Sequence, residues 1–197
     1  MPRYFEFDVS LRDIEPKIWR RFLLRDSATF LDLHYAIQNA GDWGNDHLFA
    51  FYPKKSSGDA IAGGDPLGGQ FDGDEPAAVD VRLSSYFTAR GRKCMYLYDF
   101  GDSWEVDITL KSIVESEEKF QRRLVGGARA FPMDDCGGLP GYYDCLVAVG
   151  AEKDDSYDPD ELEERRGWLG DWSPESFDLE KARKEFDLPK AKEGKAK

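Results

Sequence analysis

The segment Lys93–Leu110 constrains the fold most, because apolar and polar residues alternate there beside a short turn. Apolar side chains occupy every other position of Trp104–Leu110, which is the period of a strand with one buried face. The apolar run Lys93–Tyr98 precedes it, and the acidic turn Asp99–Asp102 joins the two. Two strands joined this closely pair antiparallel, so we predict a β-hairpin. We expect Gly101 to supply the positive φ of its turn.

A second hairpin is predicted at the N-terminus. Apolar residues alternate with polar ones along Phe5–Leu11, and a turn at Arg12–Pro16 leads into a second alternating segment, Ile18–Leu24. The alternation in that segment leaves either Trp19 or Arg20 on the apolar face. We therefore expect one of these two side chains to lie at an edge or in a pocket.

One helix is predicted between the hairpins. Thr29 and Asp32 have the spacing of a capping box, with Asp in place of the usual Glu. Apolar residues recur at helical spacing between Phe30 and Ile37, and Gly41 is expected to end the helix.

The remaining segments are shorter or less regular. Residues 53–76 contain six glycines and few large apolar residues, so we expect a flexible glycine-rich excursion there. Two further short strands are predicted at His47–Tyr52 and Val79–Leu83. Helix start signals then predict three C-terminal helices, at Tyr142–Val149, at Asp158–Arg165 and one that Ser173-Pro174-Glu175 opens.

Strands that precede helices in this order predict an α+β fold. We expect a single domain of residues 1–186, with a mostly antiparallel sheet built from the two hairpins, one early helix and a helical C-terminal third. Residues 187–197 are rich in lysine and are expected to form a flexible tail.

Composition excludes several classes of protein. Asp and Glu total 39 against 27 Lys and Arg, and a net charge of −12 disfavours binding to a phosphate backbone. No apolar run reaches the length of about 18 residues that a membrane helix needs, and the N-terminus lacks the apolar core of a signal peptide. Three cysteines without a CxxC pair fit free thiols in a reducing compartment. We therefore expect a soluble cytoplasmic protein.

Four motifs resemble, in their order, those of the plasmid pRiA4b ORF-3-like family. They are IEPKIWRR (14–21), TFLDLHYAIQNAGDW with DHLFAF (29–43 and 46–51), YLYDFGDSWEVDITL (96–110) and DDCGGLPGYYDCL (134–146). The resemblance runs from about Arg3 to Phe186. It implies a shared fold, and members labelled transposon-passenger or resolvase-like suggest an association with mobile elements. The chain departs from the family in residues 126–133, which contain no cysteine.

One candidate binding site follows from the polar, glycine-bearing turns that interrupt the apolar strands, where functional loops tend to lie. We expect aromatic side chains to line a pocket beside an arginine, with carboxylates at its rim. These candidate ligand-binding residues are Trp19, Arg20, Tyr98, Asp99, Asp102, Trp104 and Asp135.

Three functions remain open on the sequence. The favoured one is a non-catalytic binding or accessory module with an unidentified protein or small-molecule partner and no predicted cofactor. The first alternative is a metal-assisted hydrolase that holds a divalent metal through His47 and Asp46, whereas His34 is expected to be a satisfied residue of the core. The second is a nucleic-acid accessory factor, which the net charge disfavours. No complete catalytic constellation is present, so catalysis is not predicted.

Overall fold

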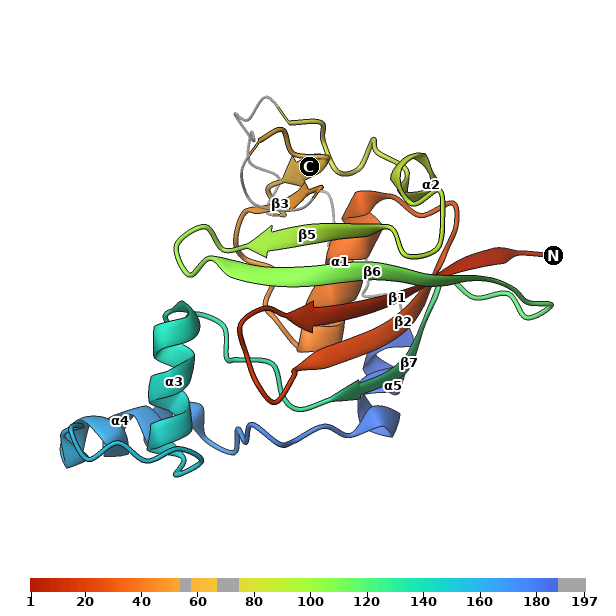
Figure 1. Ribbon diagram of the computed structural model, residues 1–197. Helices are drawn as coiled ribbons and strands as arrows, with labels where there is room; N and C mark the ends of the chain where they lie inside the picture. The colour runs from red at the N-terminus through yellow and green to blue at the C-terminus, as the bar shows by residue number, and fades with distance from the viewer. Residues whose placement is uncertain (54–57, 67–74, 188–197) are drawn as a thin grey trace, which may run out of the picture.

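The two predicted hairpins form the centre of one antiparallel sheet (Figure 1). The structure is a computed structural model that describes residues 1–53, 58–66 and 75–187. The hairpin strands are β1 (Arg3–Leu11), β2 (Trp19–Arg25), β5 (Lys93–Tyr98) and β6 (Trp104–Glu115). Because β6 pairs with both β5 and β1, the hairpins lie side by side.

Three further strands extend this sheet to the order β4-β3-β5-β6-β1-β2-β7. They are β3 (Phe49–Tyr52), β4 (Ala62–Gly64) and β7 (Arg122–Ala128). The strand predicted at His47–Tyr52 is therefore present in shortened form, whereas β7 was not predicted, because its sequence, RRLVGGA, shows no clear alternation.

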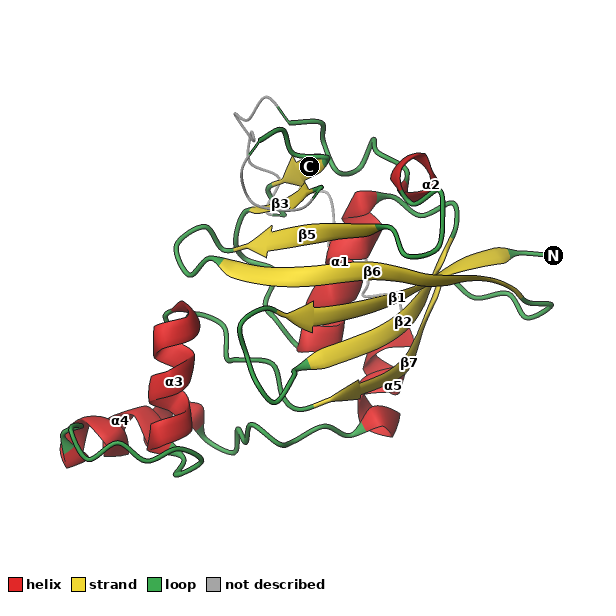
Figure 2. Ribbon diagram, viewed as in Figure 1, coloured by secondary structure: helices red, strands yellow, loops and turns green. Residues whose placement is uncertain are grey.

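Within the described residues, five helices accompany the sheet (Figure 2). They are α1 (Phe30–Gly41), α2 (Leu83–Tyr86), α3 (Gly138–Ala148), α4 (Pro159–Leu169) and α5 (Leu179–Asp187). Helix α1 lies across one face of the sheet, α5 lies beside β7, and α3 and α4 extend from the sheet end that carries the β5–β6 turn. This arrangement confirms the predicted α+β class.

The start of α1 is the predicted capping box. Thr29 Oγ1 accepts a hydrogen bond from the Asp32 amide at 3.2 Å, and Asp32 Oδ2 accepts one from the Thr29 amide at 2.8 Å. The helix ends at Gly41, as predicted, but the residue with left-handed backbone is the C-cap Asp42. Gly41 is explained by packing instead, since a Cβ there would lie 2.4 Å from the Phe131 ring.

Replacing Thr29 tests the contribution of this cap. The change Thr29→Ala removes the oxygen that accepts from the Asp32 amide. It should lower the free energy of unfolding by about 1 kcal/mol, the usual cost of losing an N-cap. Urea unfolding at pH 7 measures the difference, and Thr29→Ser, which keeps the hydroxyl, should restore most of the loss. Equal destabilisation by Ala and Ser would contradict the capping explanation.

Two predicted elements were wrong. Val79–Leu83 forms no strand but leads into α2, with only an isolated bridge between Thr29 and Arg82. The last helix begins at Leu179 rather than at Ser173, because Asp178 Oδ1 accepts from two amides of its first turn.

Part of the predicted glycine-rich excursion lies outside the described residues, namely 54–57 and 67–74. Its described part contributes β4, which pairs with β3, so the excursion is not wholly peripheral to the sheet. The predicted tail at residues 188–197 also lies outside the described residues. None of the helices in the described ranges combines the length and apolar character needed to cross a membrane.

Strand alternation decides between Trp19 and Arg20. In β2 the buried positions are Arg20, Phe22 and Leu24, so Arg20 points toward α1 and Trp19 toward the opposite face. Arg20 is 4% exposed, and its guanidinium donates to the carbonyl oxygens of Ala40, Trp19 and Ala128. The buried side of the sheet thus includes one arginine bonded to backbone carbonyls.

Candidate metal-binding site

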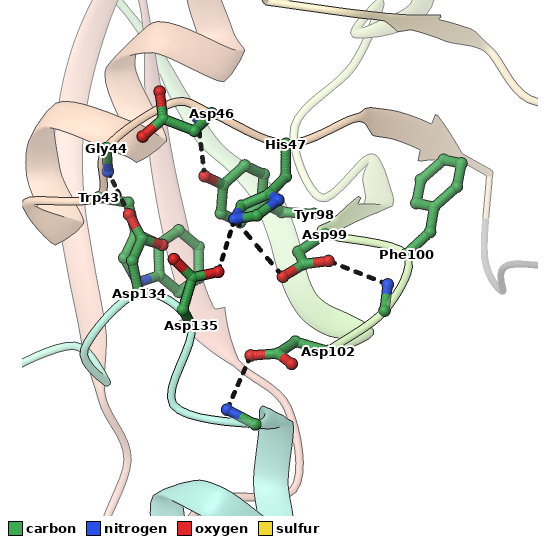
Figure 3. Close-up of polar contacts among 12 residues, drawn as sticks. Trp43, Gly44, Asp46, His47, Tyr98, Asp99, Phe100, Asp102, Asp134 and Asp135 are labelled. Atoms are coloured by element: carbon green, nitrogen blue, oxygen red, sulfur yellow. Dashed lines mark hydrogen bonds and ion pairs between the residues drawn. The ribbon is translucent and has the colours of Figure 1, made fainter.

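Three connecting segments meet at one end of the sheet. They are the α1–β3 connection (42–48), the β5–β6 turn (99–103) and the β7–α3 connection (129–137) (Figure 3). His47 comes from the first, Asp99 from the second and Asp135 from the third. Residues that lie far apart in the sequence therefore gather around one imidazole.

The imidazole of His47 lies between two carboxylates. Its Nε2 is 3.0 Å from Asp135 Oδ1 and 3.7 Å from Asp99 Oδ2. One ligand atom from each of these three residues lies within 4.8 Å of the others. The His47 ring also packs edge-on against Tyr98, with ring centroids 5.6 Å apart.

The turn conformation orients Asp99. Asp99 adopts a left-handed φ of 52°, and its Oδ1 accepts from the Gly101 amide at 2.9 Å. The other oxygen, Oδ2, faces His47. The expectation that Gly101 has positive φ was wrong: Asp99 and Ser103 adopt it instead. An aspartate tolerates this region because its side chain can bond locally to the backbone.

A second aspartate of the turn fastens the β7–α3 connection. Asp102 Oδ2 accepts from the Gly137 amide at 3.0 Å. Gly138 has φ of 67°, and a Cβ there would lie 2.5 Å from the Asp102 carbonyl oxygen. This close approach of the turn to the start of α3 positions Asp135 beside His47.

A buried polar network supports the α1–β3 connection. His34 Nδ1 lies 2.7 Å from the Tyr96 hydroxyl, and its Nε2 is bonded to Asn45 Oδ1. Gln38 donates to the same hydroxyl at 2.9 Å and accepts from the Asn45 amide at 3.1 Å. The network ties Asn45, two residues before His47, to α1 and β5. His34 is 0% exposed, as expected for a satisfied core residue.

Further acidic groups surround the imidazole. Asp134 accepts from the Gly44 amide, and burial together with the carboxylates of Asp135 and Asp46 raises its pKa. The Tyr98 hydroxyl accepts from the Asp46 amide at 3.3 Å, and burial raises the pKa of Tyr98. The site is thus strongly negative, which favours a cation over an anion.

The distances suit a divalent transition metal. Ligand atoms about 2.1 Å from a metal lie roughly 3.0 to 3.4 Å apart in octahedral or tetrahedral geometry. The His47–Asp135 separation already matches this range, and the His47–Asp99 separation needs only a small side-chain shift. An imidazole nitrogen with two carboxylate oxygens suits Zn²⁺, Mn²⁺ or Fe²⁺.

Four of the seven predicted binding residues lie together at this site. They are Tyr98, Asp99, Asp102 and Asp135. Trp104 lies beneath them in the core, 2% exposed, with its ring centroid 6.0 Å from that of Trp43. Trp19 and Arg20 lie elsewhere, on opposite faces of β2.

Of the predicted metal ligands, His47 belongs to the cluster and Asp46 does not. The Asp46 carboxylate lies beside Gly44 instead. Asp99 and Asp135 take its place. The sequence predicts both as binding residues, but at the rim of a separate pocket.

Fold and site define an α+β protein whose antiparallel seven-stranded sheet carries one histidine and two aspartates on converging loops. A sequence model of the plasmid pRiA4b ORF-3-like protein family matches residues 3–181. The chain belongs to this family, as the four motifs indicated.

Two relatives support this membership. The uncharacterized protein y4hQ of Sinorhizobium fredii (strain NBRC 101917 / NGR234) is 30% identical over 145 residues, which cover 72% of this chain and 70% of that protein. The crystal structure of MM3350, a protein of unknown function from Methanosarcina mazei Go1, superimposes with a TM-score of 0.75 at 32% identity. That match covers 91% of this chain and 96% of MM3350.

Proposed function

We propose that this chain is a binding module that holds its ligand through one divalent transition-metal ion at His47, Asp99 and Asp135. The observation that carries the proposal is the convergence of one imidazole nitrogen and two carboxylate oxygens within 4.8 Å. Three protein ligands leave coordination positions open. The side chains of His47 and Asp135 are 30% and 72% exposed, so a ligand can reach the metal from solvent.

The proposal combines two predictions that are alternatives in the sequence analysis, namely a binding module and a metal site that includes His47. An oxygen donor, from a small molecule or from a side chain of a partner protein, would complete the coordination. If the protein is associated with mobile elements, as the names given to family members suggest, that association would determine which partner it binds and not how the metal site is built. Nucleic acid is a poor ligand for a site with carboxylates at Asp46, Asp99, Asp102, Asp134 and Asp135.

A metal-assisted hydrolase is the second candidate, favoured by the same three-ligand geometry. Catalytic zinc sites commonly combine three protein ligands with one water, and the metal lowers the pKa of that water to about 7. Hydrolysis of an ester or phosphoester by the metal-loaded protein, lost in Asp99→Asn, would favour this candidate. Metal binding without turnover would favour the binding module.

Metal titration tests the proposal directly. After treatment with a chelator and its removal, native mass spectrometry and calorimetry with Zn²⁺, Mn²⁺ and Co²⁺ should show one ion per chain. Asp99→Asn and His47→Ala should each weaken binding by at least the roughly 10- to 100-fold that is typical when an outer-shell partner of a metal ligand is lost. Asp46→Asn is the matched control, since its carboxylate lies outside the cluster, and it should bind as the wild type does.

The same geometry also fits a direct hydrogen bond between His47 Nε2 and Asp135 Oδ1, 3.0 Å apart, without a metal. Under that alternative, Co²⁺ would produce no visible absorption that depends on His47, and His47→Ala would not change the affinity for any ion. Either result would overturn the metal-binding proposal.

A further inference from the structure

The face of the sheet opposite α1 carries a pocket that is separate from the metal-ligand cluster. No helix in the described part of the chain lies over this outer face (Figure 1). The pocket has a volume of about 360 Å³, within the roughly 300 to 1,000 Å³ of small-molecule sites. The side chains that line this outer pocket include Ser10, Lys17, Trp19, Arg21, Lys93 and Thr109.

The register of the strands explains why a pocket forms there. Ser10 of β1 lies opposite Trp19 of β2, and Thr109 of β6 lies opposite Lys93 of β5. Strands β1 and β6 pair with each other, so the short side chains of Ser10 and Thr109 lie between longer ones on either side. Neither hydroxyl makes a hydrogen bond within the described residues, so both can bond to a ligand.

Ion pairs balance the acidic side chains around the outer pocket. Three acids pair with three cations there: Asp8 with Arg21 and Lys111, and Glu105 and Asp107 with Arg12. Asp8 Oδ2 accepts a hydrogen bond from Arg21 Nη2 at 2.9 Å and lies 3.5 Å from Lys111 Nζ. These six charges therefore cancel, and the aspartates do not make the pocket negative.

Two further lysines line the outer pocket without a carboxylate partner. Lys17 and Lys93 are exposed, and neither makes an ion pair within the described residues. Lys17 lies just before β2, and Lys93 begins β5, so they add positive charge on two sides of the pocket. On a chain with a net charge of −12, this pocket is a place that favours an anion.

Trp19 supplies an aromatic wall. Its indole lies over Gly126 of β7, where a Cβ would be 3.5 Å from the ring atom Cη2. The guanidinium carbon of Arg21 lies 5.9 Å from the ring centroid. Indole rings bind planar aromatic groups by stacking. Trp19 was predicted to bind a ligand, and the outer pocket provides a place for one away from the metal-ligand cluster.

We propose that the outer pocket binds a small aromatic phosphate ester, with its ring against Trp19 and its charge balanced by Lys17 and Lys93. Two unpaired lysines match a phosphate monoester, whose charge at pH 7 is about −1.5 to −2. The hydroxyls of Ser10 and Thr109 donate to phosphate oxygens. Strands lie about 4.8 Å apart, so the three spacings from β2 to β5 span about 14 Å, which leaves room for a ring and a phosphate.

Calorimetry with adenosine monophosphate (AMP) tests this proposal on the full chain. In the presence of a chelator, which keeps metal away from His47, AMP should bind at one site per chain. Adenosine lacks the phosphate and ribose 5-phosphate lacks the ring, so each should bind at least about tenfold more weakly. Absence of saturable AMP binding, or equal binding of AMP and either fragment, would overturn the proposal. This site does not depend on the metal, so neither result bears on the proposed function.

Substitutions at the wall of the outer pocket test the assigned contacts. Trp19→Ala, Lys17→Ala and Lys93→Ala should each weaken AMP binding by about tenfold, whereas Trp19→Phe keeps a ring and should retain most of the affinity. Trp168→Ala and Lys181→Ala are matched controls, because these exposed residues lie on α4 and α5. Both controls should bind AMP as the wild type does, and an equal loss in them would contradict the assigned contacts.

Filling the outer pocket tests where the ligand lies. In Ser10→Phe the new ring points away from the core, so urea unfolding should stay close to that of the wild type while AMP binding is lost. Wild-type affinity in Ser10→Phe would place the ligand elsewhere and overturn the proposal. Loss of AMP binding in His47→Ala would also overturn it. Tighter binding of indole-3-acetate than of AMP would overturn the assignment of a phosphate ester.

Discussion

Replacing Arg20 with methionine should lower the free energy of unfolding by about 3 kcal/mol. Its guanidinium donates to the carbonyl oxygens of Ala40, Trp19 and Ala128, and each loses its partner in the variant. A buried polar group left without a partner costs about 1 to 3 kcal/mol. Part of the total cost for the three carbonyls is offset, because the methionine variant no longer buries a charge. Burial lowers the pKa of Arg20 to about 9, so the side chain remains charged at pH 7.

Arg21 is a matched control for this experiment. It occupies the next position of β2, points to the opposite face and pairs with Asp8 at the surface, with its side chain 38% exposed. Arg21→Met should change stability by less than about 1 kcal/mol, as expected for an exposed ion pair. Urea unfolding at pH 7 measures both variants. Equal losses for Arg20→Met and Arg21→Met would contradict a special role for Arg20.

Arg20 acts on the site only through packing. Its guanidinium lies over the rings of Phe177 and Phe131, 4.1 and 4.8 Å from their centroids. Phe131 packs edge-on against Trp43, which stacks on Tyr98 beneath His47. The geometry therefore favours a structural role for Arg20 over the ligand-binding role proposed from the sequence.

The hairpins could be predicted because their signal is local. Alternation along β1, β2 and β6 reflects one buried and one exposed face, and each strand has its partner nearby in the sequence. Strand β7 lacks this signal. It contains Gly126 and Gly127, and glycine fits there because a Cβ at Gly127 would lie 2.7 Å from both Arg20 and Phe177. This need for glycine arises from contacts in the tertiary structure, so the alternation of apolar and polar residues along the sequence does not reveal it.

The residues of the candidate site could be named from the sequence, but their grouping could not. Asp99 and Asp135 were singled out because they lie in glycine-bearing turns, and His47 because histidine is a common metal ligand. Their meeting depends on left-handed backbone at both aspartates and on the contact of Gly138 with the Asp102 carbonyl. From the sequence, Asp46 is the predicted carboxylate ligand instead, because it directly precedes His47.

The largest pH effect on stability is expected from His34, which is buried at the base of the same site. Its Nε2–H donates to Asn45 Oδ1 and its Nδ1 accepts from the Tyr96 hydroxyl, a pattern that only the neutral imidazole can make. Burial lowers the pKa of His34 to about 3, from an unfolded value of 6.5. Between these values the unfolded chain binds a proton that the folded chain does not. Stability therefore falls as the pH falls below 6.5.

The expected loss is about 2 to 3 kcal/mol between pH 6.5 and 4.5, at 1.36 kcal/mol for each pH unit. Urea unfolding at pH 7.0, 5.5 and 4.5, in the presence of a chelator, measures it as the difference between wild type and His34→Gln. The variant should be less stable at pH 7 but should lose less stability on acidification, because it lacks the titrating group. His47→Gln retains His34 and should keep the steep fall. If His34→Gln fell as steeply as the wild type, another group would control the acid sensitivity, and the neutral His34 network would not be its origin.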